Sequence, residues 1–419
     1  MILMTLLMLT KFFPYGTGES FIENEIDEFS KYYDKIIIIA CEVEENISSI
    51  RKVPANVEYY RVPMKKRTQR IIDLFNGIRY LFSSKQVISE ERNKCKDIKQ
   101  KLFLSYFEAK CRRIYDYIIK NNYIDNIEEN DYVLYSFWLF ATARLGLLIN
   151  DKKKASYLFS RAHGYDLYEY KNKVDYLPYR NLFLDEYNCV FPCSKNGSEH
   201  LIRQYNKFSD KIKTSYLGTE DHGIGFHSDD GIFRVISCSR IVPVKRINKL
   251  IDALSLLDDK NFNIEWIHIG DGKQLDKFKK EARKKLKNIS FNFMGNLANS
   301  EVINYYKNNP VDLFVNVSSS EGLPVSIMEA ISFGIPVIAT DVGGTSEIVI
   351  NNNTGILVNK YFSDNELANE IRKMLEYNFN DTYRQFRINC RKYWCENFQS
   401  ENNYKSLCIY IKNEMNLNN

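Results

Sequence analysis

One stretch of the chain, residues 311–358, constrains the fold more than any other. It contains two short apolar runs, residues 312–317 and 335–340, and between them a helical segment that begins near Pro324 and ends at Gly334. Proline fits the first helical position, and a glycine just past the last turn adopts the left-handed cap without a steric clash. Strands that are apolar throughout are typical of parallel sheets covered on both faces. The stretch therefore predicts a strand, a helix and a second strand of an open α/β sheet, with the loop 318–323 at the edge where such sheets bind ligands.

Two carboxylates, Glu321 and Glu329, lie eight residues apart in this loop and helix. The free amides of the first helical turn, together with the helix macrodipole, favour an anion such as a diphosphate at the helix start. A carboxylate would repel a phosphate, so we expect the two glutamates to accept hydrogen bonds from neutral hydroxyls on either side of it. A ligand of this kind is a sugar nucleotide. The alternative is that Glu321 only complements the helix dipole and that Glu329 is solvated.

The segments SSSEGLPVSIMEA and GIPVIATDVGGTSEIV resemble the E-x7-E signature region of the retaining glycosyltransferases of family 4. The resemblance implies the GT-B fold, an α/β architecture of two Rossmann-like domains facing each other across a cleft. It also implies that a sugar moves from a nucleoside diphosphate sugar, linked to UDP or GDP, to a glycan or lipid-linked glycan acceptor with retention of the anomeric configuration. Relatives of this family commonly act in bacterial cell-surface polysaccharide biosynthesis.

A second strand, residues 233–237, is followed by a loop that contains Arg240 and Lys245. We expect these cations at the same sheet edge as Glu321, where arginine can bind phosphate through two parallel hydrogen bonds and lysine supplies a compact charge. In the family that the sequence resembles, the matching residues hold the donor diphosphate; the alternative is a pair of solvated surface cations. No Asp-x-Asp pair occurs in the sequence, so we expect no metal ion and no cofactor besides the donor itself.

The N-terminal segment predicts a strand at residues 2–9, a glycine loop, a helix from about Ile22 and a strand at residues 35–40. A dinucleotide fingerprint would need a third glycine where Phe21 stands, which disfavours a dehydrogenase. Gly16 and Gly18 still permit a close backbone approach to a ligand. In the resembling family this loop faces donor and acceptor; the alternative is a plain tight turn.

The resemblance also assigns roles to residues. The segment SRAHGYD follows a predicted strand, residues 155–160, and is similar to the segment in which relatives present a histidine to the donor sugar. His163 would therefore contact the sugar near the reacting carbon, although a histidine there is otherwise more often structural. Glu321 would bind sugar hydroxyls and Glu329 the ribose. The expected catalytic set is His163, Arg240, Lys245 and Glu321, and the expected donor-binding set is Gly16, Gly18, Arg240, Lys245, Glu321, Gly322, Leu323, Pro324 and Glu329.

The length of 419 residues predicts two domains. We expect an acceptor-binding domain at residues 1–225, a nucleotide-sugar-binding domain at residues 226–395, and a terminal helix, residues 396–419, that crosses back to the first domain. The net charge of +5 argues against nucleic acid as a partner. Nine scattered cysteines fit reduced thiols in a cytoplasmic protein.

Two segments bear on contact with a membrane. The apolar run at residues 132–149 is interrupted by Arg144 and Gly146, so we expect a strand followed by a helix instead of a membrane span. Residues 64–122 are helical and rich in lysine, with an aromatic stripe that includes Phe107. This region either covers the sheet or rests on an anionic membrane surface, at the inner face of the cell membrane.

Two other functions fit the same residues. One is a sugar-nucleotide epimerase on the same fold, and the other is a non-catalytic partner subunit that binds a sugar nucleotide. The sequence specifies neither the donor base nor the acceptor.

Overall fold

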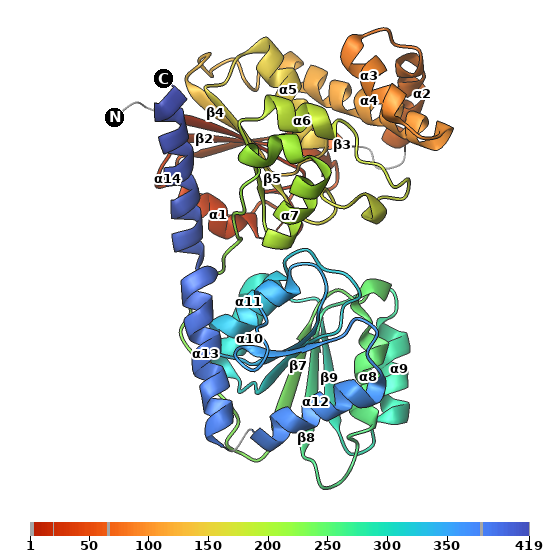
Figure 1. Ribbon diagram of the computed structural model, residues 1–419, viewed down its shortest axis with the longest axis vertical. Helices are drawn as coiled ribbons and strands as arrows, with labels where there is room; N and C mark the ends of the chain where they lie inside the picture. Colours follow the sequence, from red (N-terminus) through yellow and green to blue (C-terminus); the bar gives the residue numbers. More distant parts are fainter. Residues whose placement is uncertain (1–3, 20, 65–67, 378–379, 419) are drawn as a thin grey trace. The chain divides into compact units, whose positions relative to one another are not determined.

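The computed structural model describes residues 4–19, 21–64, 68–377 and 380–418. The chain forms two compact units, Met1–Ser215 together with Tyr404–Asn419, and Tyr216–Asn403 (Figure 1). The division falls between residues 215 and 216, about ten residues before the expected boundary at 225. The last residues, Tyr404–Asn419, are part of the first unit, within the segment that we expected to return to it.

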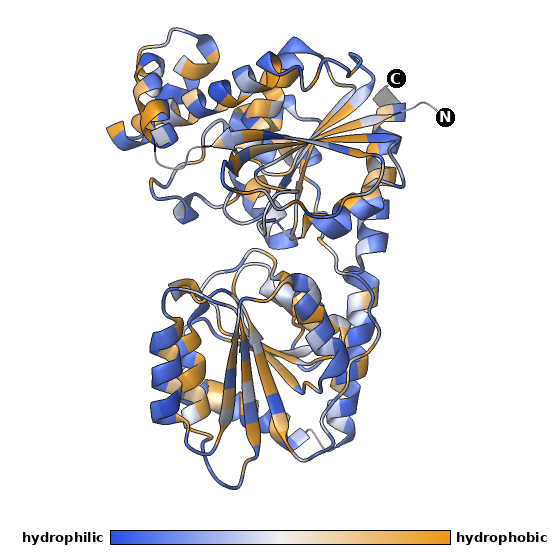
Figure 2. Ribbon diagram, turned by 180° about the vertical axis from the view of Figure 1, so that it is seen from behind, coloured by the Kyte–Doolittle hydropathy of each residue, from blue (hydrophilic) through white to orange (hydrophobic). Residues whose placement is uncertain are grey.

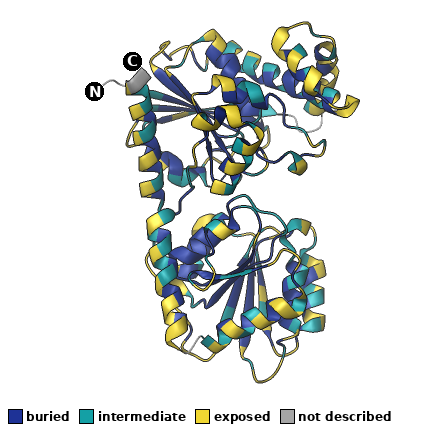
Figure 3. Ribbon diagram, in the orientation of Figure 1, coloured by how far each residue is buried: buried dark blue, intermediate teal, exposed yellow. Residues whose placement is uncertain are grey.

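The first unit contains, among the described residues, a six-stranded parallel sheet with the order β3-β2-β1-β4-β5-β6. Its central strands are buried throughout, as Figure 3 shows, which explains their continuous apolar sequences. The strands are β1 (Thr5–Thr10), β2 (Lys35–Glu44), β3 (Val57–Met64), β4 (Tyr132–Ser136), β5 (Tyr157–Ala162) and β6 (Cys189–Pro192). The helices are α1 (Ile22–Phe29), α2 (Thr68–Leu81), α3 (Gln86–Lys94), α4 (Ile98–Lys120), α5 (Ala141–Lys152), α6 (Arg180–Glu186), α7 (Lys195–Gln204) and the end of α14 (Ser400–Asn418).

The second unit repeats this plan with the order β12-β11-β10-β7-β8-β9. The strand order reverses where β7 pairs with β10, and open α/β sheets bind ligands outside the carboxyl ends of the strands at such a switch point. The strands are β7 (Phe233–Cys238), β8 (Ile264–Ile269), β9 (Ser290–Gly295), β10 (Leu313–Asn316), β11 (Val337–Thr340) and β12 (Gly355–Val358). The helices are α8 (Ile247–Ser255), α9 (Leu275–Lys285), α10 (Asn299–Asn308), α11 (Val325–Ser332), α12 (Asp364–Tyr377) and α13 (Asp381–Asn397).

The strand–helix–strand unit predicted from residues 311–358 is confirmed as β10, α11 and β11. The helix begins one residue later than predicted, because Pro324 is the N-cap residue and not the first helical residue. Gly334 has a φ of 72° just after the C-cap residue Phe333, in the left-handed conformation that was expected. The loop before α11 therefore leaves the sheet at the switch point.

The apolar run at residues 132–149 is a strand followed by a helix, as predicted: β4 and then α5. Arg144 is buried on α5, where its guanidinium makes two hydrogen bonds of 2.9 Å to the carboxylate of Glu108 on α4. Among the described helices, none has the length and apolar content needed to cross a membrane. The nine cysteines are all free thiols.

The aromatic stripe of the basic region lies on α4, and its apolar side chains belong to the core that covers the sheet: Phe107, Cys111, Ile114 and Ile118. The neighbouring cations are paired within the protein, since Lys110 lies 2.6 Å from Glu42 and Arg113 lies 2.8 Å from Asp73. The stripe on α4 is therefore a covering face of the sheet, and contact of the basic region 64–122 with a membrane stays a prediction.

Candidate functional site

The loops that follow β7 and β10 are joined at the switch point of the second unit. The Ser319 N–H donates to the carbonyl of Val244 at 2.8 Å. Arg246, in a left-handed conformation with φ 50°, donates from its guanidinium to the carbonyl of Val317 at 2.6 Å and to that of Ser318 at 3.2 Å. Arg246 was not among the expected site residues, because its partners are about seventy positions away in the sequence. By fixing the two loops to each other, it also fixes the residue before it, Lys245.

Lys245 and Glu321 meet at this edge. The Nζ atom of Lys245 lies 2.6 Å from Oε1 of Glu321, and both side chains are largely buried. Asn316, the last residue of β10, donates from its side-chain amide to the same oxygen at 3.3 Å. Two of the expected catalytic residues are thus brought together directly before the start of α11.

Glu329 lies in α11 and is 7% exposed, so it is not a solvated helix residue. The side-chain amide of Asn299, at the start of α10, donates to its Oε1 at 2.6 Å. Burial raises the pKa of Glu329 to about 7, and the hydrogen bond from Asn299 acts in the opposite direction. At neutral pH the group is therefore close to the point where it gains or loses a proton. Asn299 was not predicted because nothing in its local sequence marks it.

Arg240 is exposed in the loop after β7. Within the described part of the chain, its guanidinium makes no hydrogen bond or ion pair of the kind that holds Lys245. The structure therefore brings Lys245 to Glu321 and leaves Arg240 at the surface of the same loop.

Glycines let the neighbouring loops approach the loop that contains Glu321. Gly343, after β11, has a φ of 59°, and a Cβ atom there would lie 2.3 Å from the carbonyl oxygen of Glu321. The next residue, Gly344, donates its N–H to the carbonyl of Gly322 at 2.7 Å. Leu323 is buried, and Pro324 is the N-cap residue of α11. The loops after β7, β10 and β11 are therefore joined to one another by hydrogen bonds at this end of the sheet.

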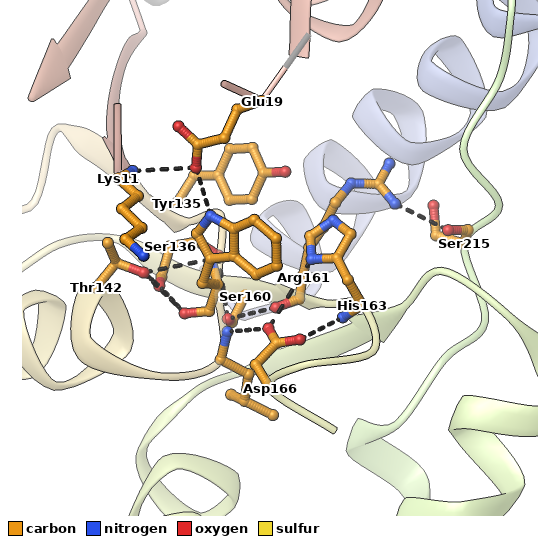
Figure 4. Close-up of polar contacts among 12 residues, drawn as sticks. Lys11, Glu19, Tyr135, Ser136, Thr142, Ser160, Arg161, His163, Asp166 and Ser215 are labelled. Atoms are coloured by element: carbon orange, nitrogen blue, oxygen red, sulfur yellow. Dashed lines mark hydrogen bonds and ion pairs between the residues drawn. The ribbon is translucent and has the colours of Figure 1, made fainter. Parts of the chain in front are cut away.

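In the first unit, His163 follows β5 and lies beside Asp166 (Figure 4). Its ring centroid is 4.6 Å from that of Phe137 and 4.5 Å from that of Trp138. The side chain is 8% exposed, and neither ring nitrogen has a hydrogen-bond partner among the described residues. Asp166 accepts hydrogen bonds from the backbone N–H groups of His163 and Leu139, both at 2.8 Å, and so joins the loops after β4 and β5. Nδ1 of His163 lies 3.9 Å from Oδ2 of Asp166, and Nε2, which has no hydrogen-bond partner among the described residues, is suited to contact a hydroxyl-bearing ligand.

Glu19 closes the glycine loop after β1. Its carboxylate accepts hydrogen bonds from the N–H groups of Phe12 at 2.7 Å and Phe13 at 2.8 Å, and a further one from the indole N–H of Trp138 (Figure 4 shows Glu19 in this network). The Gly16 N–H donates to the carbonyl of Ser49 at 3.0 Å, and the Gly18 carbonyl accepts from Arg51. These backbone groups are engaged within the unit, and a ligand contact of the two glycines stays a prediction. Glu19 and Trp138 were not predicted, since only the fold brings them together.

Part of the chain is similar in sequence to known glycosyltransferases. Residues 225–393 match the family model described as glycosyl transferases group 1. The chain is 30% identical over 178 residues to the O-antigen biosynthesis glycosyltransferase WbnH of Escherichia coli. The aligned region covers 42% of this chain and 47% of that protein. It is 27% identical over 263 residues to the uncharacterized glycosyltransferase MJ1178 of Methanocaldococcus jannaschii, over 62% of this chain and 69% of that protein. The chain spans about half the length of the first of these curated relatives.

Solved structures resemble the whole chain. Sucrose-phosphate synthase from Thermosynechococcus elongatus superposes with a TM-score of 0.70 at 14% identity, covering 99% of both chains. Anabaena HepE in complex with UDP-glucose gives a TM-score of 0.64 at 16% identity, covering 98% of this chain and 99% of that one. The expected fold class is confirmed: the chain has the GT-B fold, an α/β architecture with two Rossmann-like domains. The second of these domains is the part that matches the glycosyl transferase group 1 model.

Proposed function

We propose that this protein is a retaining glycosyltransferase that moves a sugar from a UDP- or GDP-linked donor to a glycan or lipid-linked glycan acceptor. The observation that carries the proposal is the Lys245–Glu321 contact of 2.6 Å at the switch point, directly before α11, with Glu329 buried on that helix. A cation, helix amides and two carboxylates at one edge suit a ligand with a diphosphate flanked by hydroxyls.

In this proposal the donor diphosphate lies at the start of α11 and shares Lys245 with Glu321. Arg240, exposed on the same loop, supplies the second charge. These contacts strengthen as negative charge develops on the leaving diphosphate, which lowers the barrier; one such donor contributes about 3 kcal/mol in a well-studied hydrolase. A phosphate oxygen of the leaving group takes the acceptor's proton during attack on the same face. No metal ion is required, because these residues and the amides neutralise the diphosphate.

Glu321 accepts hydrogen bonds from the donor sugar, and Glu329 accepts them from the ribose. His163 contacts the sugar near the reacting carbon through Nε2, which has no hydrogen-bond partner among the described residues. The relative WbnH is named for O-antigen biosynthesis, and HepE was crystallised with UDP-glucose. These names support a role in bacterial cell-surface polysaccharide biosynthesis. For that role we expect the protein in the cytoplasm, at the inner face of the cell membrane.

The experiment is a screen of UDP- and GDP-sugars for thermal stabilisation, followed by measurement of nucleoside diphosphate release with the best donor. Lys245→Ala and Glu329→Ala should each reduce donor binding or turnover about tenfold or more. Lys249→Ala is the matched control, since Lys249 also pairs with a carboxylate in this unit, Asp364 at 3.0 Å, but away from the loop that contains Glu321. Full activity of both site variants would refute the proposed site.

Two rival functions give different results in the same assay. An epimerase would convert the donor to an epimeric nucleotide sugar without an acceptor. A non-catalytic partner subunit would be stabilised by the donor and release no nucleoside diphosphate.

A further inference from the structure

The outer face of α2 exposes apolar side chains that no part of the described chain covers. Phe75 is 68% exposed, Ile78 is 51% exposed, and Phe82, just after the helix, is 82% exposed. Figure 2 shows hydrophobic residues along this helix, and Figure 3 shows exposed positions on it. Contiguous exposed apolar surface marks a site of interaction with another molecule or a membrane. We define the α2 face by six residues: Ile71, Ile72, Leu74, Phe75, Ile78 and Phe82.

Packing on α4 fixes which side of α2 points outward. Asp73 is 2% exposed, and its two carboxylate oxygens accept hydrogen bonds from the Arg113 guanidinium at 2.8 Å and 3.1 Å. On the same side, a Cβ atom at Gly77 would lie 3.0 Å from the backbone of Ser105, so the two helices approach closely there. Turning α2 about its axis to bury the apolar face would break the ion pair between Asp73 and Arg113. The outward apolar face is therefore a consequence of the fold.

Cations flank this face. Arg70 and Arg79 are both exposed, and because they are nine residues apart, at about 100° per residue, they lie on opposite edges of the helix. Residues 65–85 contain six lysines and arginines and one acidic residue, Asp73, so this segment carries the whole formal net charge of +5. Asp73 is paired with Arg113 and does not offset the exposed charge.

We propose that α2 docks the protein on an anionic lipid surface, with Phe75, Ile78 and Phe82 among the headgroups and Arg70 and Arg79 against lipid phosphates. An apolar stripe flanked by arginines is the composition of helices that lie in a membrane interface. Cations near an anionic leaflet each add to the attraction. A second copy is a poorer occupant, because two such faces would bring like charges together. The α2 face belongs to the first unit and the Lys245–Glu321 pair to the second, so we expect Lys245→Ala to leave this binding unchanged.

The test is co-sedimentation of the full chain with vesicles of phosphatidylcholine, with and without phosphatidylglycerol. The protein should bind the anionic vesicles roughly tenfold or more tightly, and added salt should weaken that binding. Equal binding to both kinds of vesicle, or no binding to either, overturns the proposal.

Variants separate the two contributions. The triple variant Phe75→Gln, Ile78→Gln and Phe82→Gln should bind anionic vesicles about tenfold more weakly, and Arg70→Gln with Arg79→Gln should lose the preference for anionic lipid. Ile388→Gln is the matched control, because Ile388 is 50% exposed on another helix, α13. It should bind as the natural protein does.

Thermal unfolding and circular dichroism verify the fold of each variant. If the triple variant unfolds, the arginine variant still tests the proposal, because Arg70 and Arg79 are exposed and contribute little to packing. Unchanged vesicle binding by the folded triple variant contradicts the proposal. So does a change of oligomeric state on gel filtration with vesicle binding intact, since that result assigns the face to a second copy.

Discussion

The Nζ atom of Lys245 lies 2.6 Å from Oε1 of Glu321, although the two residues are 76 positions apart in the chain. The contact exists because Arg246 fastens the loop after β7 to the loop after β10. The cation is therefore placed before α11 by its neighbour and not by its own local sequence.

This pair should show measurable coupling. Lys245→Ala leaves the carboxylate of Glu321, 11% exposed, without its cation, so we expect a loss of about 1–3 kcal/mol in the free energy of unfolding. The double variant Lys245→Ala, Glu321→Gln should lose less than the sum of the single variants. Urea unfolding measures all three. The half-buried pair Lys249–Asp364, whose side chains are 37% and 35% exposed, is the control and should couple by less than about 1 kcal/mol. Equal coupling in both pairs would contradict the prediction.

The stability of the protein should depend on the protonation of Glu329. Its pKa is raised to about 7 in the folded protein, from the ordinary value of 4.5 in the unfolded chain. The folded state holds this proton more tightly, so the contribution to stability is complete below about pH 4.5 and is lost as the pH rises through 7, by about 3 kcal/mol in total.

Chemical unfolding of the natural protein and of Glu329→Gln at several pH values checks this. The stability of the natural protein relative to the variant should fall between about pH 4.5 and 7. Parallel curves for the two proteins would show that Glu329 does not titrate in this range.

Gly343 should tolerate no side chain. A Cβ atom there would lie 2.3 Å from the carbonyl oxygen of Glu321, and the φ of 59° is unfavourable for alanine. Gly343→Ala should therefore weaken donor binding as well as lower stability by more than about 1 kcal/mol. Gly223 has a φ of 82° and open space around it, so Gly223→Ala isolates the backbone effect. Similar donor affinity for the two variants, measured by calorimetry, would exclude this support role.

His163 should act on turnover and not on folding. His163→Phe keeps a ring beside Phe137 and Trp138 but removes both nitrogens, of which Nδ1 lies 3.9 Å from Oδ2 of Asp166 and neither makes a hydrogen bond among the described residues. We expect unchanged thermal stability and turnover reduced by about tenfold or more. His200, whose Nε2 lies 3.6 Å from Glu169, is the control: His200→Phe should keep its turnover. A normal turnover of His163→Phe would identify His163 as a structural residue.

Local patterns predicted much of the fold. The apolar runs at residues 312–317 and 335–340 became β10 and β11, and Gly334 ended the helix, because strand burial and helix capping depend on a few neighbouring residues. The interrupted run at residues 132–149 was read correctly for the same reason. The aromatic stripe of α4 was left open, since periodicity shows that a helix has an apolar side but not what covers it.

The sequence by itself determined the order of strands and helices, the loop that begins α11 and the presence of carboxylates and cations near it. Only the tertiary structure decided that Asn299 bonds to Glu329, that Arg246 positions Lys245, and that the ion pair of Asp73 with Arg113 turns the apolar side of α2 outward. The physical reason is distance along the chain. Helix caps and strand patterns are set by contacts between near neighbours, whereas these pairs are joined only when separate loops and helices pack together.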